Sequence, residues 1–369
     1  MDHLLSLAQT LASFALVLGV LVSIHELGHY AAARWCRVGV EAFSIGFGPT
    51  LKSWTDKHGT EWKLSMLPLG GYVKMHGMAG EDAAADGGQA EEIRPQDAFT
   101  HKKVWQRAVI SAAGPAANFA LAIVLFGAMQ ATIGAQVALP VVGTVVDGSA
   151  AAAAGIKPGD AIVSIAGAPI TTFEDLRGIV AASPDRDLVL GLRRDGHDLA
   201  LKVHVHGVGP NHATGQLGVQ SGKIITVRRG PLQAAWGGVT ETWHQISQTY
   251  TGLAGLIMSG TGAENLGGPI AIAHLSGQVA KLGIVSLIDF IAMMSVQLGL
   301  LNLLPIPILD GGHLLFLGAE ALRGRPLPAR AQEYGYRLGM AIIATVFIFV
   351  SFNDLAREGV FAWMHHLAG

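Results

Sequence analysis

Four stretches of this sequence carry no charged side chain and consist mainly of apolar residues. They are residues 4–24, 108–146, 290–309 and 338–353. A helix needs about 20 such residues to cross the hydrocarbon core of a bilayer, and the first three stretches reach that length. The fourth is shorter, but Tyr334 and Tyr336 precede it and Arg357 follows it, and such residues anchor a span at the membrane interfaces. The sequence therefore predicts a polytopic α-helical membrane protein with four transmembrane helices.

The composition agrees with a chain that lies in lipid. Half of its 369 residues are hydrophobic and 14% are charged, whereas soluble domains carry about 25% charged residues. The net charge of -2 and the lack of a basic block give no reason to expect nucleic-acid binding. Cys36 is the single cysteine, so no intrachain disulfide is expected.

A signal peptide is the competing interpretation of the first apolar stretch. No Lys or Arg precedes Leu4, and no small-x-small cleavage site is present, although both features are typical of signal peptides. A cut there would also separate the following His-Glu-Leu-Gly-His motif from its membrane anchor. We therefore expect residues 4–24 to remain as a helix.

The distribution of Lys and Arg predicts the orientation in the membrane. Positive residues follow the first span, precede the second and separate the third from the fourth, and loops rich in such residues face the cytoplasm. These residues are Arg34, Arg37, Lys102, Lys103, Arg107, Arg323, Arg325, Arg330 and Arg337. By alternation, both termini and residues 137–281 are expected on the extracytoplasmic side of a bacterial inner membrane.

Two regions outside the spans have patterns of their own. Residues 135–210 show short β-branched runs and one helical stretch that Thr171 or Thr172 could cap, which is typical of a small α+β domain. A stretch rich in Gly, Ala, Asp and Glu at 78–98 reads as a cytoplasmic linker within the first region, residues 1–134. Residues 284–369 hold the last two spans.

Residues 211–283 are expected to form a membrane-associated connector. Trp236, Trp243 and Tyr250 are spaced seven residues apart, which places them on one stripe of a helix. An amphipathic helix that lies on the membrane surface or packs on the bundle explains the stripe better than a ligand site does.

Residues 63–75 contain two short apolar runs around Pro68, Gly70 and Gly71. This pattern predicts a hairpin. Its apolarity beside the membrane favours a re-entrant hairpin, which is tolerated only where protein or a water-filled cavity covers the free backbone groups.

The strongest chemical signal is the run His25-Glu26-Leu27-Gly28-His29. Histidines at positions i and i+4 project from one face of a helix and can bind the same zinc ion. Glu26 would then lie beside the metal, where a carboxylate can accept a proton from metal-activated water. Two histidines and a glutamate at the end of an uncharged span are costly to bury without a function.

Zinc in a catalytic site takes a third protein ligand. Asp310 ends the third uncharged stretch and is the carboxylate placed to meet His25 and His29. Just before it, Pro305 and Pro307 interrupt the helical hydrogen bonds, so the freed backbone and Asn302 could bind an unwound substrate segment; a simple helix kink is the alternative. Asn118, in Gly114-Pro115-Ala116-Ala117-Asn118, either packs between helices or holds a zinc ligand or an oxyanion.

With these motifs in order, the chain resembles the site-2 protease family, in particular the bacterial regulator of sigma-E proteases. Family elements in family order are the His-Glu-x-x-His motif, the runs 46–49 and 68–75, Gly114-Pro115 with Asn118, and Asn302 to Gly311 with its Pro-x-Pro and Leu-Asp-Gly. The resemblance covers nearly the whole chain.

The resemblance implies a zinc-dependent endopeptidase that cleaves within membranes. It implies that His25, His29 and Asp310 bind zinc, that Glu26 is the catalytic acid and base, and that Asn302 contacts the substrate. The hairpin with Gly70, Gly71 and Tyr72 becomes a clamp that adds a strand to the unwound substrate. The expected substrates are single-pass membrane proteins, such as an anti-sigma factor trimmed beforehand on the outer side, and remnant signal peptides.

The α+β domain then looks like a PDZ domain that acts as a size filter, with Gly155-Ile156-Lys157-Pro158-Gly159-Asp160 similar to a turn of such domains. The chain departs from the family here, because the best-known Gram-negative members have two PDZ domains in tandem and this sequence has room for one. A non-catalytic PDZ scaffold and a metal transporter remain alternatives at the level of sequence.

Overall fold

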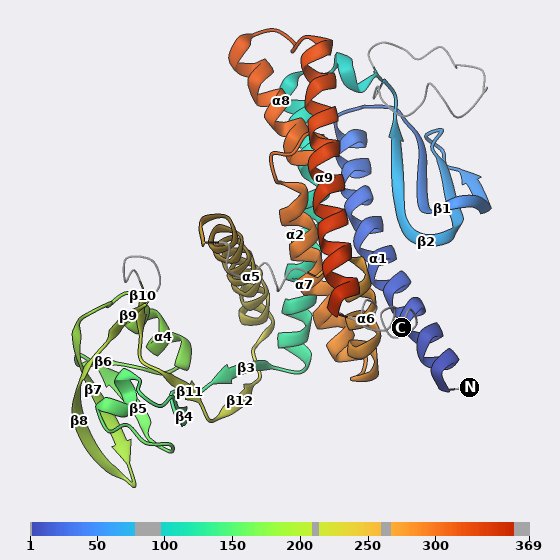
Figure 1. Cartoon of the computed structure of the whole chain (residues 1–369). Helices are drawn as coiled ribbons and strands as arrows, with labels where there is room; N and C mark the ends of the chain where they lie inside the picture. Colours follow the sequence, from blue (N-terminus) through green and yellow to red (C-terminus); the bar gives the residue numbers. More distant parts are fainter. Residues whose placement is uncertain (1, 78–96, 209–213, 260–266, 358–369) are drawn as a thin grey trace, which may run out of the picture. The chain divides into compact units, whose positions relative to one another are not determined.

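The computed structural model of the chain describes residues 2–77, 97–208, 214–259 and 267–357 (Figure 1). Contacts within the chain define two compact units, one formed by Met1–Ala128 with Ala235–Gly369 and the other by Met129–Ala234. We call them the helical unit and the sheet unit. The predicted linker at 78–98 falls almost entirely outside the described residues.

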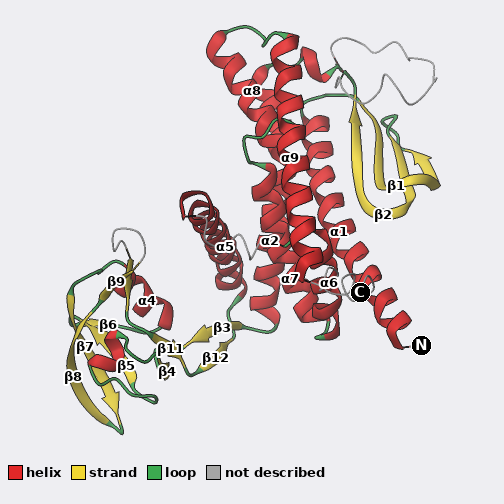
Figure 2. Ribbon diagram, viewed as in Figure 1, coloured by secondary structure: helices red, strands yellow, loops and turns green. Residues whose placement is uncertain are grey.

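Among the described residues, four helices are long and apolar enough to cross a membrane. They are α1 (Asp2–Trp35), α2 (Val104–Thr132), α7 (Ile284–Asn302) and α9 (Ala329–Arg357) (Figure 2). The chain is a polytopic membrane protein, as its uncharged stretches predicted.

Two of the predicted spans end earlier than their uncharged stretches. The second stretch runs to residue 146, but α2 ends at Thr132, because Gly134 turns the backbone with φ +105° and a strand follows. The third stretch runs to residue 309, but α7 ends at Asn302, since Pro305 and Pro307 cannot continue a helix.

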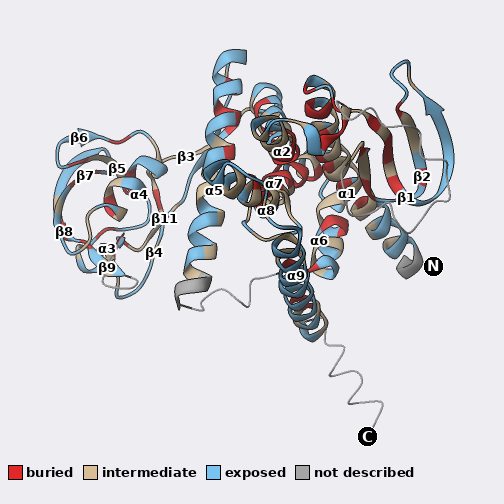
Figure 3. Cartoon of the chain, turned by 90° about the horizontal axis from the view of Figure 1, so that it is seen from above, coloured by how far each residue is buried: buried red, intermediate tan, exposed pale blue. Residues whose placement is uncertain are grey.

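The helical unit buries polar groups and exposes apolar ones. His25, His29, Asn118 and Ser295 are buried, and Figure 3 shows that buried residues gather on α2 and α7 while α9 is largely exposed. Apolar side chains such as Leu5 and Ile348 are 65% and 68% exposed. Such a surface is stable where lipid tails cover it.

Small residues bring α1 and α2 together. A Cβ added at Gly28 would collide with the carbonyl oxygen of Ala113 on α2. Close approach through small residues is the usual basis of helix packing in membranes.

The strands β1 (Val40–Thr55) and β2 (Glu61–Met75) form an irregular sheet in the helical unit. Both strands bend, so that residues 42–45 pair with 71–74 on one side and with 61–64 on the other, while residues 50–55 pair with 61–65. Residues 61–64 run parallel to residues 42–45, and residues 71–74 run antiparallel to them. The chain therefore reverses direction within 63–75, as the hairpin prediction requires, but in the described structure the two arms lie on opposite sides of residues 42–45 and pair with these and not with each other. Gly70, with φ +133°, lies in this reversal.

Shorter helices complete the helical unit. They are the single turn η2 (Phe99–His101), α5 (Pro231–Ser259), α6 (Pro269–Lys281) and α8 (Asp310–Arg323). Trp236, Trp243 and Tyr250 are all exposed on α5, whereas Gly238 on the opposite face contacts the backbone of α2 at Ile123 and Gly127.

The N-terminus of α6 is capped by a residue far away in the sequence. The carboxylate of Asp354 on α9 accepts hydrogen bonds of 3.0 Å from the backbone N–H groups of Gly268 and Ala271. Asp354 is 2% exposed, so its charge is satisfied mainly by these groups and by the helix dipole. This cap joins α6 to α9.

The sheet unit contains a four-stranded antiparallel sheet in the order β6-β5-β7-β8 and three two-stranded pairs. Its strands and helices are β3 (Ala135–Ala138), β4 (Val142–Val145), α3 (Ala150–Ala153), β5 (Ala161–Ile165), β6 (Ala168–Pro169), α4 (Phe173–Ala181), β7 (Asp187–Arg194), β8 (His197–His204), β9 (His206–Val208), β10 (Thr214–Gln216), β11 (Val219–Ser221) and β12 (Ile224–Val227). Ile162, Leu190 and Leu192 are fully buried in its core.

The sheet unit extends beyond residues 135–210 at both ends. The strands β11 and β12 pair with β4 and β3, so residues assigned by sequence to the connector complete this unit. As expected, Thr172 caps α4: its hydroxyl accepts from the N–H of Asp175, and the Asp175 carboxylate accepts from the N–H of Thr172.

Candidate metal centre and active site

The helix α1 places two histidines in the interior of the helical unit. His25 and His29 lie one turn apart and are 7% and 8% exposed. Their Nε2 atoms are 3.2 Å apart, with the rings edge to face. The i, i+4 spacing therefore brings two metal-binding nitrogens to one point.

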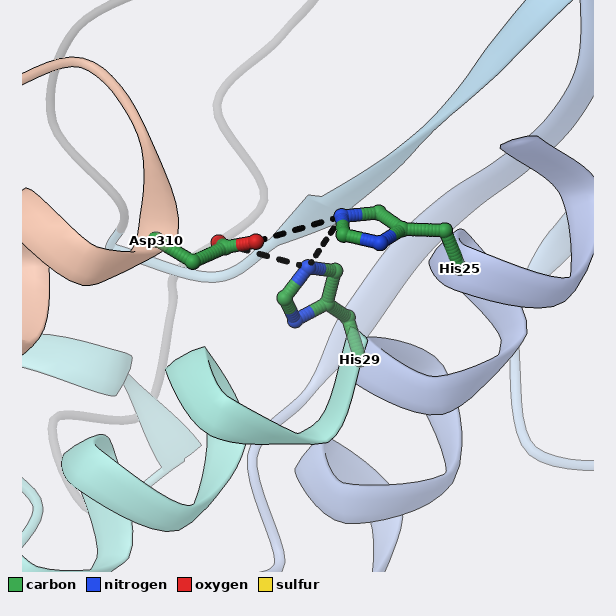
Figure 4. Close-up of side chains that lie close together, drawn as sticks. All are labelled: His25, His29 and Asp310. Carbon is green, nitrogen blue, oxygen red and sulfur yellow. Dashed lines mark hydrogen bonds and ion pairs between the residues drawn. The ribbon is translucent and has the colours of Figure 1, made fainter. Parts of the chain in front are cut away.

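Asp310 approaches this point from α8. Its Oδ2 lies 3.2 Å from Nε2 of His25 and its Oδ1 lies 3.4 Å from Nε2 of His29. Figure 4 shows the three side chains directed at one another. Of the described residues, these three form the group of His, Cys, Asp or Glu side chains able to hold a metal ion, with ligand atoms within 4.8 Å of one another.

Asp310 is the first residue of α8 and does not end the third span. Between α7 and α8 the chain is not helical, and Ile308 has φ +108°, a conformation that is costly for a β-branched residue. Gly311 and Gly312 contact the carbonyl groups of Leu303 and Ile306. This tight loop and the helix N-terminus hold the carboxylate in place.

The ring nitrogens that face away from the centre are hydrogen-bonded. Nδ1 of His29 donates to the carbonyl oxygen of Ile110, at 2.8 Å, which leaves Nε2 with a free lone pair. Nδ1 of His25 lies 3.1 Å from the amide nitrogen of Asn118, and the Asn118 amide oxygen is buried without a partner. Turning this amide by 180° lets its oxygen accept a hydrogen bond from Nδ1–H, which leaves Nε2 of His25 unprotonated as well.

These contacts fit a cation. Oδ2 of Asp310 is buried and has no hydrogen-bond partner, although it lies 3.2 Å from Nε2 of His25. An ionised carboxylate and two unprotonated nitrogens directed at one point form a donor set that zinc accepts. Hydrogen bonds to the far side of each imidazole are what metal-binding histidines usually make.

Gly114 on α2 provides the space for both rings. A Cβ at this position would lie 2.8 Å from Cε1 of His25 and closer still to the imidazole of His29. The sequence indicated Gly114 only as a packing element, yet it borders the two imidazole rings of the candidate metal centre directly.

Glu26 faces the sheet. The backbone N–H of Val73 on β2 lies near its carboxylate, and its Cγ lies 3.8 Å from the position of a Cβ at Gly71. The segment of β2 that contains Gly70, Gly71 and Tyr72 thus lies beside Glu26.

The remaining sequence candidates lie around the loop before Asp310. The side-chain amide of Asn302 donates to the carbonyl oxygen of Leu298 on its own helix, at 3.1 Å, and so is not aimed at the three converging side chains. Pro305 and Pro307 lie in the non-helical loop, where Pro307 contacts Gly339 of α9.

Sequence reasoning missed some supporting groups. The carbonyl of Ile110 carries no side-chain signal, and Ser295 donates to the backbone carbonyl of Asn118 at 2.8 Å.

Asp56, in the turn between β1 and β2, accepts four hydrogen bonds. Burial acts to raise the pKa of its carboxyl, but the donors Trp62, His58, Thr60 and Tyr30 outweigh this and lower the pKa to about 2.

Comparison with known proteins adds a family match. The profile of "Peptidase family M50" matches residues 13–346. A protein of Rhizobium meliloti that is named a zinc metalloprotease is 42% identical over 365 residues, covering 95% of this chain and 97% of its own. Metalloprotease MmpA of Caulobacter vibrioides is 38% identical, covering 96% of this chain and 97% of its own.

A more distant relative is regulator of sigma-E protease RseP of Salmonella typhimurium. It is 32% identical, and the match covers 96% of this chain and all of the relative. The alignment spans 458 positions although this chain has 369 residues. The Salmonella protein therefore contains segments that this chain lacks.

Proposed function

Because the chain belongs to peptidase family M50, the site-2 protease family, and is a zinc metalloendopeptidase, we propose that it cleaves transmembrane helices of single-pass membrane proteins. The observation that carries this proposal is the convergence of His25, His29 and Asp310 in the buried interior of the helical unit. A protease site at that depth reaches peptide bonds that lie in the membrane.

In this proposal, His25, His29 and Asp310 hold the zinc ion. Bound zinc supplies Lewis acidity, which lowers the pKa of a water molecule and polarises the scissile carbonyl. The carbonyl of Ile110 and the amide of Asn118 fix the two imidazole rings so that each presents Nε2 to the metal. The loop before α8 holds the carboxylate against both.

Glu26 transfers the proton. Its carboxylate accepts a proton from the attacking water and returns it to the amine of the leaving peptide. The position of Glu26 between the histidines along α1 and the end of β2 supports this role, because substrate bound along β2 would pass between these groups.

The substrate has to be extended, since a peptide bond within a helix is covered by its own turns. In the described part of the chain, Gly71 and Tyr72 of β2 pair with β1 along one edge, and a substrate strand would add along the other edge beside Gly70, Gly71 and Tyr72. Asn302, Pro305 and Pro307 would contact the same unwound segment after Asn302 releases the carbonyl of Leu298.

The bend of the sheet supports a re-entrant position in the membrane. Phe47, Leu51, Met66 and Leu69 are 44% to 64% exposed around the bends of β1 and β2. An exposed apolar patch of this kind is stable against lipid or a substrate helix. In this arrangement the sheet dips into the bilayer from the side on which α1 ends.

The orientation follows from the Lys and Arg residues. We infer an inner-membrane protein with α1 ending at the cytoplasm and with both termini and the sheet unit outside. The sheet unit would act as a PDZ domain that filters substrates by size. The chemistry suits pre-trimmed anti-sigma factors and remnant signal peptides, and RseP, whose name describes a regulator of sigma-E, is a relative.

The test uses the purified full chain reconstituted in vesicles with a single-pass substrate. The Glu26→Gln variant should bind zinc at the parental ratio and lose cleavage by at least about a hundredfold, since a general base contributes roughly 10²–10⁴-fold. Glu333→Gln, at an exposed position on α9, is the matched control and should cleave normally. Continued cleavage by Glu26→Gln, with zinc bound, would overturn the mechanism.

A further inference from the structure

The helix α1 carries a second pair of residues with i, i+4 spacing. His25 and His29 face α2 and α8, whereas Glu26 and Tyr30 both face the sheet. Residues four apart lie about 6 Å from each other along a helix. The sheet therefore contacts α1 at two successive turns, and one of the two contacts is the proposed catalytic glutamate.

The contact at Tyr30 is a group of hydrogen bonds to the carboxylate of Asp56, which we call the polar anchor. The Tyr30 hydroxyl donates to Oδ2 of Asp56, at 3.2 Å, and Nε1 of Trp62 donates to the same oxygen, at 3.1 Å. The other oxygen of Asp56 accepts from the backbone N–H groups of His58 and Thr60. The carboxylate thus closes the turn between β1 and β2 and also links that turn to α1.

Aromatic rings extend this anchor into the sheet. Tyr30 packs edge to face on Phe43 and Trp62, with ring centroids 5.7 Å and 5.2 Å apart. Phe43 is 2% exposed and pairs across the sheet with Val73. Since the N–H of Val73 lies near the carboxylate of Glu26, a continuous path joins Tyr30, through Phe43, to the strand beside Glu26.

A second link leads from the turn to the same strand. The hydroxyl of Thr60 donates to the carbonyl oxygen of Val40, at 2.9 Å, and Thr60 is fully buried. Val40 pairs with Met75 at the end of β2. The turn is therefore fixed both to α1 and to the segment that flanks the free edge of β2.

We propose that Tyr30 and Asp56 are positioning residues that set the substrate-binding edge of β2 relative to Glu26. Although Tyr30 follows His29 in the chain, the contacts of its side chain described above are with Asp56, Phe43 and Trp62 of the sheet, so the two residues act through the sheet. This inference rests on the proposed function, in which the substrate adds a strand at residues 70–73. Without the anchor the sheet would still form, but its free edge would no longer be held at one distance from α1.

The experiment compares Tyr30→Phe, Asp56→Asn and the double variant in the reconstituted full chain. Tyr30→Phe removes the hydroxyl that reaches the turn and keeps the ring, so kcat/KM for a single-pass substrate should fall about tenfold, as expected for a lost hydrogen bond to a charged group. The zinc-to-protein ratio should stay at the parental value. Tyr334→Phe, which alters a 70% exposed tyrosine, is the matched control.

Hydrogen exchange provides a readout that does not depend on cleavage. In Tyr30→Phe the amides of residues 71–75 should exchange faster, while those of β5 and β7 in the sheet unit keep their rates. Because the two residues act through one contact, the double variant should lose no more than the larger single effect.

Two outcomes would overturn the inference. One is unchanged exchange at 71–75 in Tyr30→Phe; the other is independent, multiplicative losses of kcat/KM in the double variant. Failure of the proposed function looks different, since the unaltered chain would then not cleave the substrate although exchange at 71–75 would still respond to Tyr30→Phe.

Discussion

The helical unit and the sheet unit place polar groups in opposite ways. In the sheet unit, Ile162, Leu190 and Leu192 are fully buried and ion pairs such as Arg193–Asp198 are exposed. In the helical unit, His25, His29 and Asn118 are inside and apolar side chains cover the outside. Each arrangement matches its solvent, because lipid offers polar groups no partners whereas water does.

This difference changes what a buried polar residue means. In a membrane, an apolar residue could replace a polar one inside the helical unit without exposing anything that lipid disfavours. A polar residue there therefore indicates a catalytic or binding role or a specific contact. In the sheet unit the apolar core provides stability and polar groups are mostly at the surface. The predictions below test this contrast, in order of decreasing effect.

The largest effect is expected for Asp310→Ala. This change removes one of the three converging ligand groups, so zinc affinity should fall by at least about a hundredfold, since even supporting groups around a metal are worth about 10–100-fold. Elemental analysis of the purified chain measures the zinc-to-protein ratio. The metal-free variant should be no less stable than the metal-free parent, because a buried carboxylate without a metal is costly.

Asp289→Ala serves as the control and should retain zinc, because Asp289 lies near the start of α7 whereas Asp310 follows its end. An unchanged zinc-to-protein ratio in Asp310→Ala would exclude Asp310 as a zinc ligand. It would also contradict the view that buried polar groups of the helical unit are present for their chemistry.

A smaller effect on the same site is expected for Gly114→Ala. The added methyl group would collide with both imidazole rings, so the rings must tilt away and zinc affinity should fall by roughly tenfold, as for other changes next to metal ligands. Competition with a chelator measures the affinity.

Gly318→Ala is the matched control, because a Cβ at this position on α8 meets no atom within 4 Å. It should leave zinc binding unchanged and stabilise its helix by up to about 1 kcal/mol. Equal zinc affinity in both variants would show that Gly114 does not limit the space at the metal centre.

The smallest effect concerns Asp160, a buried carboxylate in the sheet unit. It is 1% exposed and accepts two hydrogen bonds of 2.7 Å from Arg194 and one from the N–H of Lys157. Asp160→Asn should destabilise the sheet unit by about 2 kcal/mol with no change in zinc binding. Hydrogen exchange of β5 and β7 in the full chain measures this.

The stability of the sheet unit should depend on pH through the same contact between Asp160 and Arg194. The hydrogen bonds from Arg194 lower the pKa of Asp160 below its ordinary value, so its contribution to stability is present above the unfolded pKa of about 3.9. It is lost as the pH falls through the lower folded pKa. Asp160→Asn should remove this acid-dependent step, whereas Asp198→Asn, at an exposed ion pair, should leave the exchange of β5 and β7 at neutral pH unchanged.

Much of the helical unit could be predicted because its signals are local. The uncharged stretches mark the spans, and the spacing of His25 and His29 alone brings two ligand nitrogens together. Asp310 could be placed because few carboxylates lie at the end of an uncharged stretch. That it opens α8 was not predicted: Pro305 and Pro307 indicate a break in the helix, but they do not show that a new helix begins at Asp310.

The sheet next to the active site could not be predicted in the same way. The order of its strands depends on contacts between residues 40–45 and two segments of β2. Pro68, Gly70 and Gly71 indicate a turn, but nothing in either segment alone shows that both pair with β1. The supporting groups share this property: the carbonyl of Ile110 is a backbone atom, and Asp56 becomes informative only when Tyr30 of another element is seen to reach it.

The cap on α6 has a consequence for how the protein is made. The acceptor, Asp354, is synthesised 86 residues after the N–H group of Gly268 that it binds. A ribosome that has just released α6 therefore delivers a helix whose first turn still lacks its partner, and α6 can be completed only after α9 has been delivered to the membrane. The last span thus completes the first turn of α6, and in a chain truncated before residue 354 that turn should lack its carboxylate cap.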